Sequence, residues 1–390
     1  MKKDVFALIF VLICLSSVAA GLVASDARQL TSCPELLPGE VRLGSVTHTT
    51  IQQAIDAAQS GDVVCVGPGI YRQRIVLGEG VSVIGSGADA TVLDGGANGT
   101  VVKMASESAL IGVTVQNTGI GPFFGTDPDL MEKTIGVLAL NCQDVLLADL
   151  NITRCKIGVQ LVRSSGEVTH CQIFDCCERA GAPQDYEIVG HPLECYNSSF
   201  LIENLLSARN DGCDGVTLRG EGSAGMRFRY CTIVSTDWYG IMVRDARPSI
   251  ANCIVVGGIQ TKEGPDQPSV SFTCIWNEYS SRFSVSGEMF VSSGDTGLFA
   301  DPLFVDSLRG NYQLRSDSPC VDAGDPASTD PDGSRCDIGV YGGPEASKTA
   351  ALPSQAEQAT SSLNDRDGDG VPDGEDFCPD FPGSPEMNGC

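Results

Sequence analysis

The sequence predicts an all-β solenoid, a parallel β-helix, in which short strands stack in successive coils. Residues 135–176 contain two similar lines, which begin Ile135–Val137 and Ile157–Val159 and start 22 residues apart (157 − 135). Each line holds short apolar runs with alternating polarity, separated by polar or glycine turns, and no run is long enough for a typical helix. The 45 glycines and the aromatic content of only 6% suit tight turns and narrow interior rows. Coils stacked about 4.8 Å apart hydrogen-bond along the axis and bury one continuous core.

The N-terminus predicts export. Lys2 and Lys3 precede an apolar run from Val5 to Val18, and Val18-Ala19-Ala20 is a plausible cleavage site, so residues 1–20 are expected to be a signal peptide. No second apolar segment is long enough to span a membrane after that cleavage. The sequence therefore predicts a secreted or cell-surface protein.

Cysteine usage agrees with that location. Of the 17 cysteines, 16 remain once Cys14 is removed, and an exported chain can form disulfides. Two short-range pairs are suggested, Cys320 with Cys336 and Cys378 with Cys390. Four others recur at the start of successive repeats and predict an inward stack of small buried thiols, with disulfides as the alternative. These four are Cys171, Cys231, Cys253 and Cys274.

The charge of the chain restricts its partners. Fifty acidic against 25 basic residues give a net charge of −25, which argues against nucleic acid and anionic membranes. Such a surface would also repel an acidic polysaccharide unless calcium or a local basic patch intervened. The simplest interpretation of the charge is solubility.

Residues 21–48 form an irregular lead-in, and Thr50–Ala58 is predicted to be a short helix. Thr50 and Gln53 have the spacing of a capping box, and Ile51, Ala54, Ile55 and Ala58 form one apolar face. A helix of this kind can cover the open end of a β-helix, where strand edges and core would otherwise be exposed.

After the helix, a Gly61-Asp62 turn leads into short strands at Val63–Val66, Arg74–Leu77, Val81–Gly85 and Thr91–Gly95, with Pro68-Gly69-Ile70-Tyr71 among them. The whole stretch from Thr50 to Gly95 resembles the opening of the pectin-lyase-like right-handed parallel β-helix proteins. That resemblance implies the fold more than the function, because the fold hosts lyases, hydrolases, epimerases and proteins that are not enzymes.

Further coils are predicted along the chain, so that the β-helix domain occupies residues 49–344. Residues 177–200 break the period and are expected to be an insertion over one face, and residues 257–268 are expected to be another loop. The predicted coil segments are 101–116, 135–155, 157–176, 201–206, 215–218, 226–234, 240–256, 270–276 and 283–285.

Residues 298–343 carry a second resemblance. The runs Asp301–Asp306, Asn311–Leu314, Ser318–Gly324 and Asp337–Gly343 are similar to the closing segment of bacterial and archaeal extracellular β-helix proteins. In those proteins small apolar residues commonly stand at the two cysteine positions, so the joint presence of cysteines here supports the Cys320–Cys336 disulfide. Residues 345–364, rich in Ala, Ser, Thr and Gln, are expected to be a flexible linker.

The tail, residues 365–390, carries the sharpest motif. Side-chain oxygens recur at positions one, three, five, nine and twelve of a loop with Gly370 at position six, and the backbone carbonyl at position seven is a further ligand. Closely packed carboxylates favour calcium, and the Cys378-Pro379 ending resembles a thrombospondin type 3 repeat. A merely solvated acidic tail is the alternative. The predicted Ca²⁺ ligands are Asp365, Asp367, Asp369, Val371, Asp373 and Asp376.

No complete catalytic constellation is evident, so whether the chain is an enzyme stays open. Asn210–Gly215, with Asp211 and Asp214, faintly resembles a polygalacturonase motif, but turn residues between strands explain it equally. One repeat later, Arg244 is a candidate lyase base and Asp237, Asp245 and Arg247 are its neighbours, with surface ion pairs as the alternative. His191, with Glu194 and Asp185, is a candidate metal or sugar ligand in the insertion, with ordinary loop polarity as the alternative. His170 is expected to be structural.

Together these features favour an exported β-helix protein that binds calcium through its tail and a polysaccharide or cell-envelope glycan through its solenoid face. A polysaccharide lyase or glycoside hydrolase acting on an acidic polysaccharide is the first alternative. A surface adhesion or structural protein, with the tail as a calcium-dependent spacer, is the second.

Overall fold

The computed structural model describes residues 33–97, 99–118, 134–177, 190–210, 212–235, 238–262, 267–276, 288–290 and 296–346. The chain divides into two compact units, Met1–Glu35 and Leu36–Cys390, and all the elements below belong to the second. The signal peptide, the calcium-binding tail and most of the linker lie outside the described residues, so these domain boundaries stay predictions.

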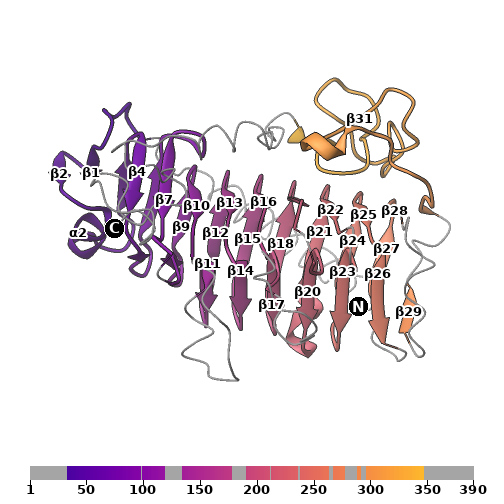
Figure 1. Ribbon diagram of the computed structural model, residues 1–390, viewed down its shortest axis with the longest axis horizontal. Coiled ribbons are helices and arrows are strands. Elements are labelled where there is room, and N and C mark those ends of the chain that lie inside the picture. The colour runs from indigo at the N-terminus through magenta and orange to yellow at the C-terminus, as the bar shows by residue number, and fades with distance from the viewer. Residues whose placement is uncertain are drawn as a thin grey trace, which may run out of the picture. The chain divides into compact units, whose positions relative to one another are not determined.

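Three long sheets, which we call A, B and C, run side by side along the second unit (Figure 1). Sheet A contains β1 (Val41–Leu43), β2 (Val46–His48), β3 (Val63–Val66), β6 (Ser82–Gly85), β9 (Ala109–Ile111), β12 (Val145–Ala148), β15 (Ser165–Thr169), β18 (Ser199–Glu203), β21 (Arg227–Arg229), β24 (Ser249–Ala251) and β27 (Ser269–Ser271). Sheet B contains β4 (Gly69–Arg72), β7 (Thr91–Asp94), β10 (Thr114–Gln116), β13 (Asn151–Thr153), β16 (Gln172–Phe174), β19 (Leu206–Ala208), β22 (Thr232–Val234), β25 (Ile254–Val256) and β28 (Cys274–Trp276). Sheet C contains β5 (Ile75–Val76), β8 (Val102–Lys103), β11 (Ile135–Leu140), β14 (Ile157–Val162), β17 (Leu193–Tyr196), β20 (Val216–Arg219), β23 (Ile241–Arg244), β26 (Ile259–Lys262) and β29 (Glu288–Phe290).

Each sheet takes every third strand, so one coil contributes one strand to each of the three sheets. Neighbouring coils pair in parallel; β1 and β29 pair antiparallel at the two ends of the stack. The predicted repeat is visible in the register, because Ile135 pairs with Ile157 and Val137 with Val159. The predicted fold, a right-handed parallel β-helix, is confirmed.

The prediction that residues 177–200 are an insertion outside the coils is wrong at its C-terminal end. β17 begins at Leu193 and β18 at Ser199, and both are full members of their sheets. Leu193 and Cys195 point into the core while Glu194 points out, so the alternation is present. Pro192 and the polar outward residues concealed this alternation in the sequence.

The helix α2 (Ile51–Ala57) packs against β1, β2, β3 and β5 and buries Ile51, Ala54 and Ile55. The Thr50 hydroxyl accepts a hydrogen bond from the Gln53 N–H at 3.1 Å, as an N-cap does. Two short 3₁₀ turns, η1 (Glu221–Gly225) and η3 (Ser307–Arg309), complete the described helical elements. None of the described helices has the length and apolar character needed to cross a membrane.

Inside the coils, side chains of like position stack in rows. The two-residue turn between sheets A and B places a residue with positive φ first and an inward side chain second, as at Asn252-Cys253. Cys171, Cys231 and Cys253 occupy this inward position and are free buried thiols, which confirms the predicted stack for these three. Cys274 is one position further along, since it pairs with Ile254, and it lies in a different cluster with Cys320.

The predicted Cys320–Cys336 disulfide is wrong. Both residues are free buried thiols, and Cys320 instead contacts Cys274, with which it shares a thiol hydrogen bond. Packing of the closing segment against sheet B, which the sequence did not indicate, determines this neighbour. Cys33 and Cys65 are each disulfide-bonded, and the predicted Cys378–Cys390 pair lies outside the described residues.

The closing segment does not continue the spiral. It forms a two-stranded antiparallel sheet from β30 (Phe304–Asp306) and β31 (Asn311–Leu314), which lies beside the outer face of sheet B near β22, β25 and β28 (Figure 1). Polar bonds fasten the following residues to that face. The Val340 N–H donates to the Thr232 hydroxyl, and Asn204 Nδ2 donates to the Val340 carbonyl, both at 3.0 Å.

Candidate functional site: the outer face of sheet C

Sheet C carries a continuous patch of polar side chains on its outer face from β14 to β26, which we call the sheet C face. Alternation in each strand sends apolar residues into the core and leaves the residues between them outside. Because the strands pair in parallel register, the outer residues of consecutive coils stand in rows. One row is Gln160, Glu194, Thr217, Met242 and Gln260, and the next is Val162, Tyr196, Arg219 and Arg244.

His191 and Glu194 lie together at the β17 coil of this face. Their side chains are buried, with residue exposures of 9% and 5%, and His191 Nε2 lies 3.8 Å from Glu194 Oε1. The other carboxylate oxygen of Glu194 accepts a hydrogen bond from Gln160 Nε2 at 2.8 Å. The site therefore joins an imidazole and a carboxylate to an amide donor from the preceding coil.

Glycines allow the backbone that carries His191 to approach the preceding coil. A Cβ on Gly190 would overlap the Lys156 carbonyl, and one on Gly158 would lie 2.5 Å from the Pro192 carbonyl oxygen. The Gly158 N–H donates to the His191 carbonyl at 3.2 Å. These close backbone contacts hold His191 just before β17.

Burial shifts the proton equilibria of both groups in opposite directions. It lowers the pKa of His191 to about 4, with Arg219 and Arg244 contributing to the decrease, while a hydrogen bond to the Asp214 backbone opposes it. Burial raises the pKa of Glu194, and the Gln160 hydrogen bond and Arg219 oppose that increase. At neutral pH the imidazole is therefore uncharged, and it can accept a proton.

Arg219 and Arg244 bring positive charge to adjacent coils of the face. They pair directly in the register of β20 and β23, and both are partly exposed. The Arg219 guanidinium carbon lies 5.6 Å from the centroid of the Tyr196 ring. Burial raises the pKa of Tyr196 to about 12; nearby Glu194 adds to this increase and Arg219 opposes it. Within the part of the chain that the structure describes, neither arginine forms an ion pair with a carboxylate.

Four buried polar atoms of this face have no hydrogen-bond partner among the residues that the structure describes. They come from four residues in the coils of β17, β20 and β26: His191 Nδ1, Thr217 Oγ1, Arg219 Nε and Gln260 Nε2. A buried polar group left without a partner costs about 1–3 kcal/mol, so such groups are rare and require an explanation. Their number on one face makes that face a candidate site for a polar ligand.

The structure brings together only some of the site residues predicted from the sequence. Arg244, His191 and Glu194 are brought together on the sheet C face. The Asn210 side chain instead accepts from the Cys176 N–H at 2.9 Å and donates to the Ile173 carbonyl at 3.0 Å, so it joins coils and is structural. Asp214 accepts from the Tyr239 N–H at 3.2 Å.

The other candidates do not join this cluster. Asp245 and Arg247 are exposed beyond the end of β23, and the side chain of His170, in the turn after β15, contacts the Thr169 hydroxyl at 2.8 Å. Asp185, Asp211 and Asp237 lie outside the described residues. No group of three or more His, Cys, Asp or Glu side chains among the described residues is placed to bind a metal ion, and the predicted calcium ligands, Asp365 to Asp376, lie outside that part.

Sequence reasoning missed Arg219, Gln160, Thr217 and Gln260. One signal for Arg219 was available, because it ends the strand Val216–Arg219 as Arg244 ends Ile241–Arg244 one repeat later. Gln160 and Thr217 are ordinary polar residues in alternating strands, and only the register shows that they share a face. Gln260 lies in β26, so the prediction that residues 257–268 form a loop is wrong for Ile259–Lys262.

Comparisons with known proteins concern the fold. No family model and no curated protein matches the sequence. Among solved structures, pectate lyase Pel9A is similar over 76% of this chain and 92% of its own, with 12% identity and a TM-score of 0.42. A pectin methylesterase from Yersinia enterocolitica matches over 52% of this chain and 80% of its own, with 12% identity and a TM-score of 0.36. A family 28 exopolygalacturonase from Yersinia enterocolitica matches over 65% and 62%, with 12% identity and a TM-score of 0.35.

Proposed function

We propose that the protein binds an acidic polysaccharide on the sheet C face, with a uronate carboxylate held by Arg219 and Arg244. The observation that carries this proposal is that these two arginines, in adjacent coils, have no carboxylate partner among the described residues. In a chain of net charge −25, they form the local basic patch that an anionic partner would require. The unpartnered Thr217 and Gln260 atoms in the neighbouring row supply hydrogen bonds for sugar hydroxyls. The predicted export would place such a face where extracellular glycans occur.

Polygalacturonate is the probe for this proposal, with binding measured by calorimetry at several salt concentrations. The double variant R219Q/R244Q removes both cations and is expected to weaken binding about 100-fold or more, since each lost charged hydrogen bond is worth about 1.5–3 kcal/mol. The matched control is Arg227→Gln, because Arg227 is exposed on sheet A, in β21. Equal affinity of the double variant and the control, or an affinity independent of salt, contradicts the proposal.

A second candidate function is β-elimination on the same polysaccharide. It is favoured by the neutral imidazole beside two arginines. The arginines would neutralise the uronate, and His191 Nδ1, which has no partner among the described residues, would take the proton α to the carboxyl group. The electron pair then forms the carbon–carbon double bond as the glycosidic C–O bond breaks. Glu194, whose raised pKa favours its protonated form, would give the leaving oxygen a proton.

An absorbance assay for the unsaturated product tests this chemistry separately from binding. His191→Gln is expected to abolish product formation while polygalacturonate affinity changes less than about threefold, since the arginines remain. His170→Gln is the matched control. If the native protein binds polygalacturonate but forms no unsaturated product, the binding proposal stands and the lyase proposal is excluded.

We also propose that the tail binds calcium through Asp365, Asp367, Asp369, Val371, Asp373 and Asp376. The support is the ligand spacing of the sequence and its resemblance to a thrombospondin type 3 repeat. Calorimetry with Ca²⁺ on the full chain should give a saturable heat that Asp369→Ala removes. Asp332→Ala, an exposed aspartate of the closing segment, is the control and should leave the heat unchanged.

A further inference from the structure

A hollow lies away from the sheet C face, between the outer face of sheet B and the closing segment. It has a volume of about 470 Å³, within the range of sites that bind small ligands. Its floor is the outward row of Val234, Val256 and Trp276, which pair in consecutive coils of β22, β25 and β28. We call it the sheet B groove.

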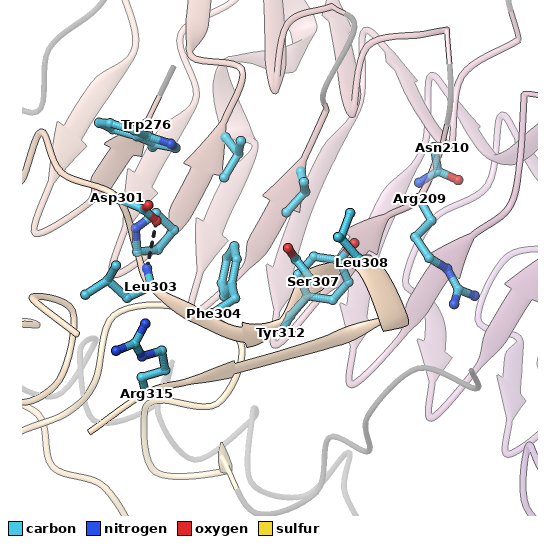
Figure 2. Close-up of a pocket in the computed structure, with 13 residues that line it drawn as sticks. Arg209, Asn210, Trp276, Asp301, Leu303, Phe304, Ser307, Leu308, Tyr312 and Arg315 are labelled. Carbon is cyan, nitrogen blue, oxygen red and sulfur yellow. Dashed lines mark hydrogen bonds between the residues drawn. The ribbon is translucent and has the colours of Figure 1, made fainter. Parts of the chain in front are cut away.

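The wall of the groove comes from β30, η3 and β31. Phe304 and Tyr312 meet edge to face, with ring centroids 5.2 Å apart and an interplanar angle of 82°, and Tyr312 packs in one cluster with Val234. Figure 2 shows these rings between two ends of different character, with Trp276 and Asp301 at one end and Arg209 at the other. The groove is therefore aromatic along its length and polar at its ends.

The charged groups at both ends already have partners within the chain. Arg209 Nη2 lies 2.8 Å from Asp175 Oδ2, and Arg315 Nη2 lies 2.9 Å from Asp317 Oδ2. The Asp301 carboxylate accepts from the Leu303 N–H at 2.9 Å and keeps oxygen capacity for another donor. An anionic ligand would thus meet neutralised cations and a free carboxylate oxygen.

A wholly apolar ligand fits no better. It would displace water from Asp301 and Arg315 without replacing those hydrogen bonds, which is unfavourable. A neutral saccharide suits both the polar ends and the aromatic length of the groove. Its hydroxyls can bond to Asp301 and Arg315 while its apolar ring face packs on the partly exposed Trp276. We propose that the sheet B groove binds a short neutral saccharide, as a site separate from the sheet C face.

Fluorescence can report on this groove because the chain has only two tryptophans, Trp276 in the groove and Trp238 just before β23. The full-length protein is titrated with cellotriose, xylotriose, mannotriose and β-1,4-galactotriose, with trigalacturonate as the anionic comparison. We expect at least one neutral trisaccharide to give a saturable change in Trp276 emission. Trp238→Phe should retain this change.

Three variants locate the binding. Trp276→Leu should weaken binding, measured by calorimetry, about tenfold or more, since an aromatic contact of this kind is worth about one factor of ten. Arg315→Gln should weaken it about threefold to tenfold through a lost hydrogen bond. Leu308→Arg should also weaken it, because Leu308 is 88% exposed beside the groove and the larger side chain narrows the mouth without entering the core. Because Arg315 and Leu308 are exposed, these two variants keep the test valid even if Trp276→Leu fails to fold.

Two results would overturn the inference. One is that no neutral trisaccharide binds, or that binding is unchanged in all three variants. The other is that trigalacturonate binds here more tightly than every neutral sugar, with an affinity that falls as salt rises. The R219Q/R244Q variant separates the two sites, because it should lose polygalacturonate binding and keep neutral trisaccharide binding unchanged.

Discussion

Arg219 on the sheet C face and Arg209 at the end of the sheet B groove both lie over an aromatic ring, but they differ in whether a carboxylate pairs with them. Each guanidinium carbon lies over an aromatic ring, 5.6 Å from the centroid of Tyr196 and 5.3 Å from that of Phe174. Arg209 is held by Asp175 from the preceding coil, whereas Arg219 has no carboxylate within ion-pair distance among the described residues. Where the chain supplies the counter-charge, the arginine stabilises the coils. Where it does not, the positive charge is available to an external anion.

The two faces also differ in how they are built. On the sheet C face, glycines at the start of the strands let each coil approach the next, and the functional side chains are fixed by backbone register. In the sheet B groove, a separate antiparallel segment packs its aromatic side chains against the outer row of the sheet. The first kind of site should therefore be sensitive to backbone crowding, and the second to loss of side-chain packing and pairing.

The variant with the largest expected effect on the free energy of unfolding is Gly215→Ala, and it tests the sensitivity of the sheet C face to backbone crowding. A Cβ there would lie 2.6 Å from both the Gly240 carbonyl oxygen and Ile233 Cγ2, so the coils would have to separate, at a cost of about 3 kcal/mol or more. Gly333→Ala in the closing segment has open space and only a positive φ of 85°, so it should cost about 1 kcal/mol. Urea unfolding measures both. Equal costs would show that the sheet C face does not depend on close backbone approach.

The next effect comes from the buried imidazole. His191 has a pKa of about 4 in the folded protein and 6.5 when unfolded, so between these values the unfolded state binds more protons. Its contribution to stability is therefore retained above pH 6.5 and lost as the pH falls towards 4, by roughly 3 kcal/mol. Glu194 acts in the opposite direction, because its raised pKa gives stability that is lost as the pH rises. The contribution of His191 is therefore measured as the difference between the native protein and a variant that lacks the imidazole.

His191→Gln is that variant, and His170→Gln is its control. Urea unfolding from pH 7 to pH 4 should show a smaller loss of stability for His191→Gln than for the native protein, with the control following the native curve. Parallel curves for all three proteins would mean that the imidazole at 191 is not held neutral by burial.

The third prediction returns to the two arginines. Arg209→Gln removes a largely buried ion pair and is expected to lower the free energy of unfolding by about 2 kcal/mol. Arg219→Gln breaks no ion pair with a described residue, so it should change stability by less than about 0.5 kcal/mol. If Arg219→Gln proved as destabilising as Arg209→Gln, Arg219 would be a structural residue and the binding proposal would lose its main support.

The sequence predicts the fold well for a physical reason that does not extend to the sites. A solenoid repeats one packing problem, so the apolar rows of Val137, Val159 and their equivalents appear as a period of 22. A functional face depends on which coils become neighbours, and coil length varies. Gln160 pairs with Glu194 across 34 positions, whereas Thr217 pairs with Met242 across 25. Without the register, these residues cannot be assigned to one row.

The groove was less accessible to sequence reasoning. The closing segment was recognised from its runs between Asp301 and Gly343, but those runs do not say where it packs. Its position on sheet B depends on contacts such as Val340 with Thr232, more than one hundred residues apart. The Cys320–Cys336 disulfide was wrongly predicted for the same reason. Packing of the closing segment on sheet B brings Cys320 into contact with Cys274 instead of with Cys336.

The smallest expected effect tests whether charge pairing determines which ligand the groove accepts. Arg315 and Asp317 are both largely exposed, so Asp317→Asn should change stability by less than about 0.5 kcal/mol. Freeing Arg315 should nevertheless raise the affinity of the groove for trigalacturonate by about twofold to threefold at low salt, since an exposed ion pair is worth only a few tenths of a kcal/mol. Neutral trisaccharide binding should stay the same, because the Arg315 donors remain in place. If Asp317→Asn left trigalacturonate binding unchanged while weakening neutral sugars, carboxylate pairing would not be what separates the groove from the sheet C face.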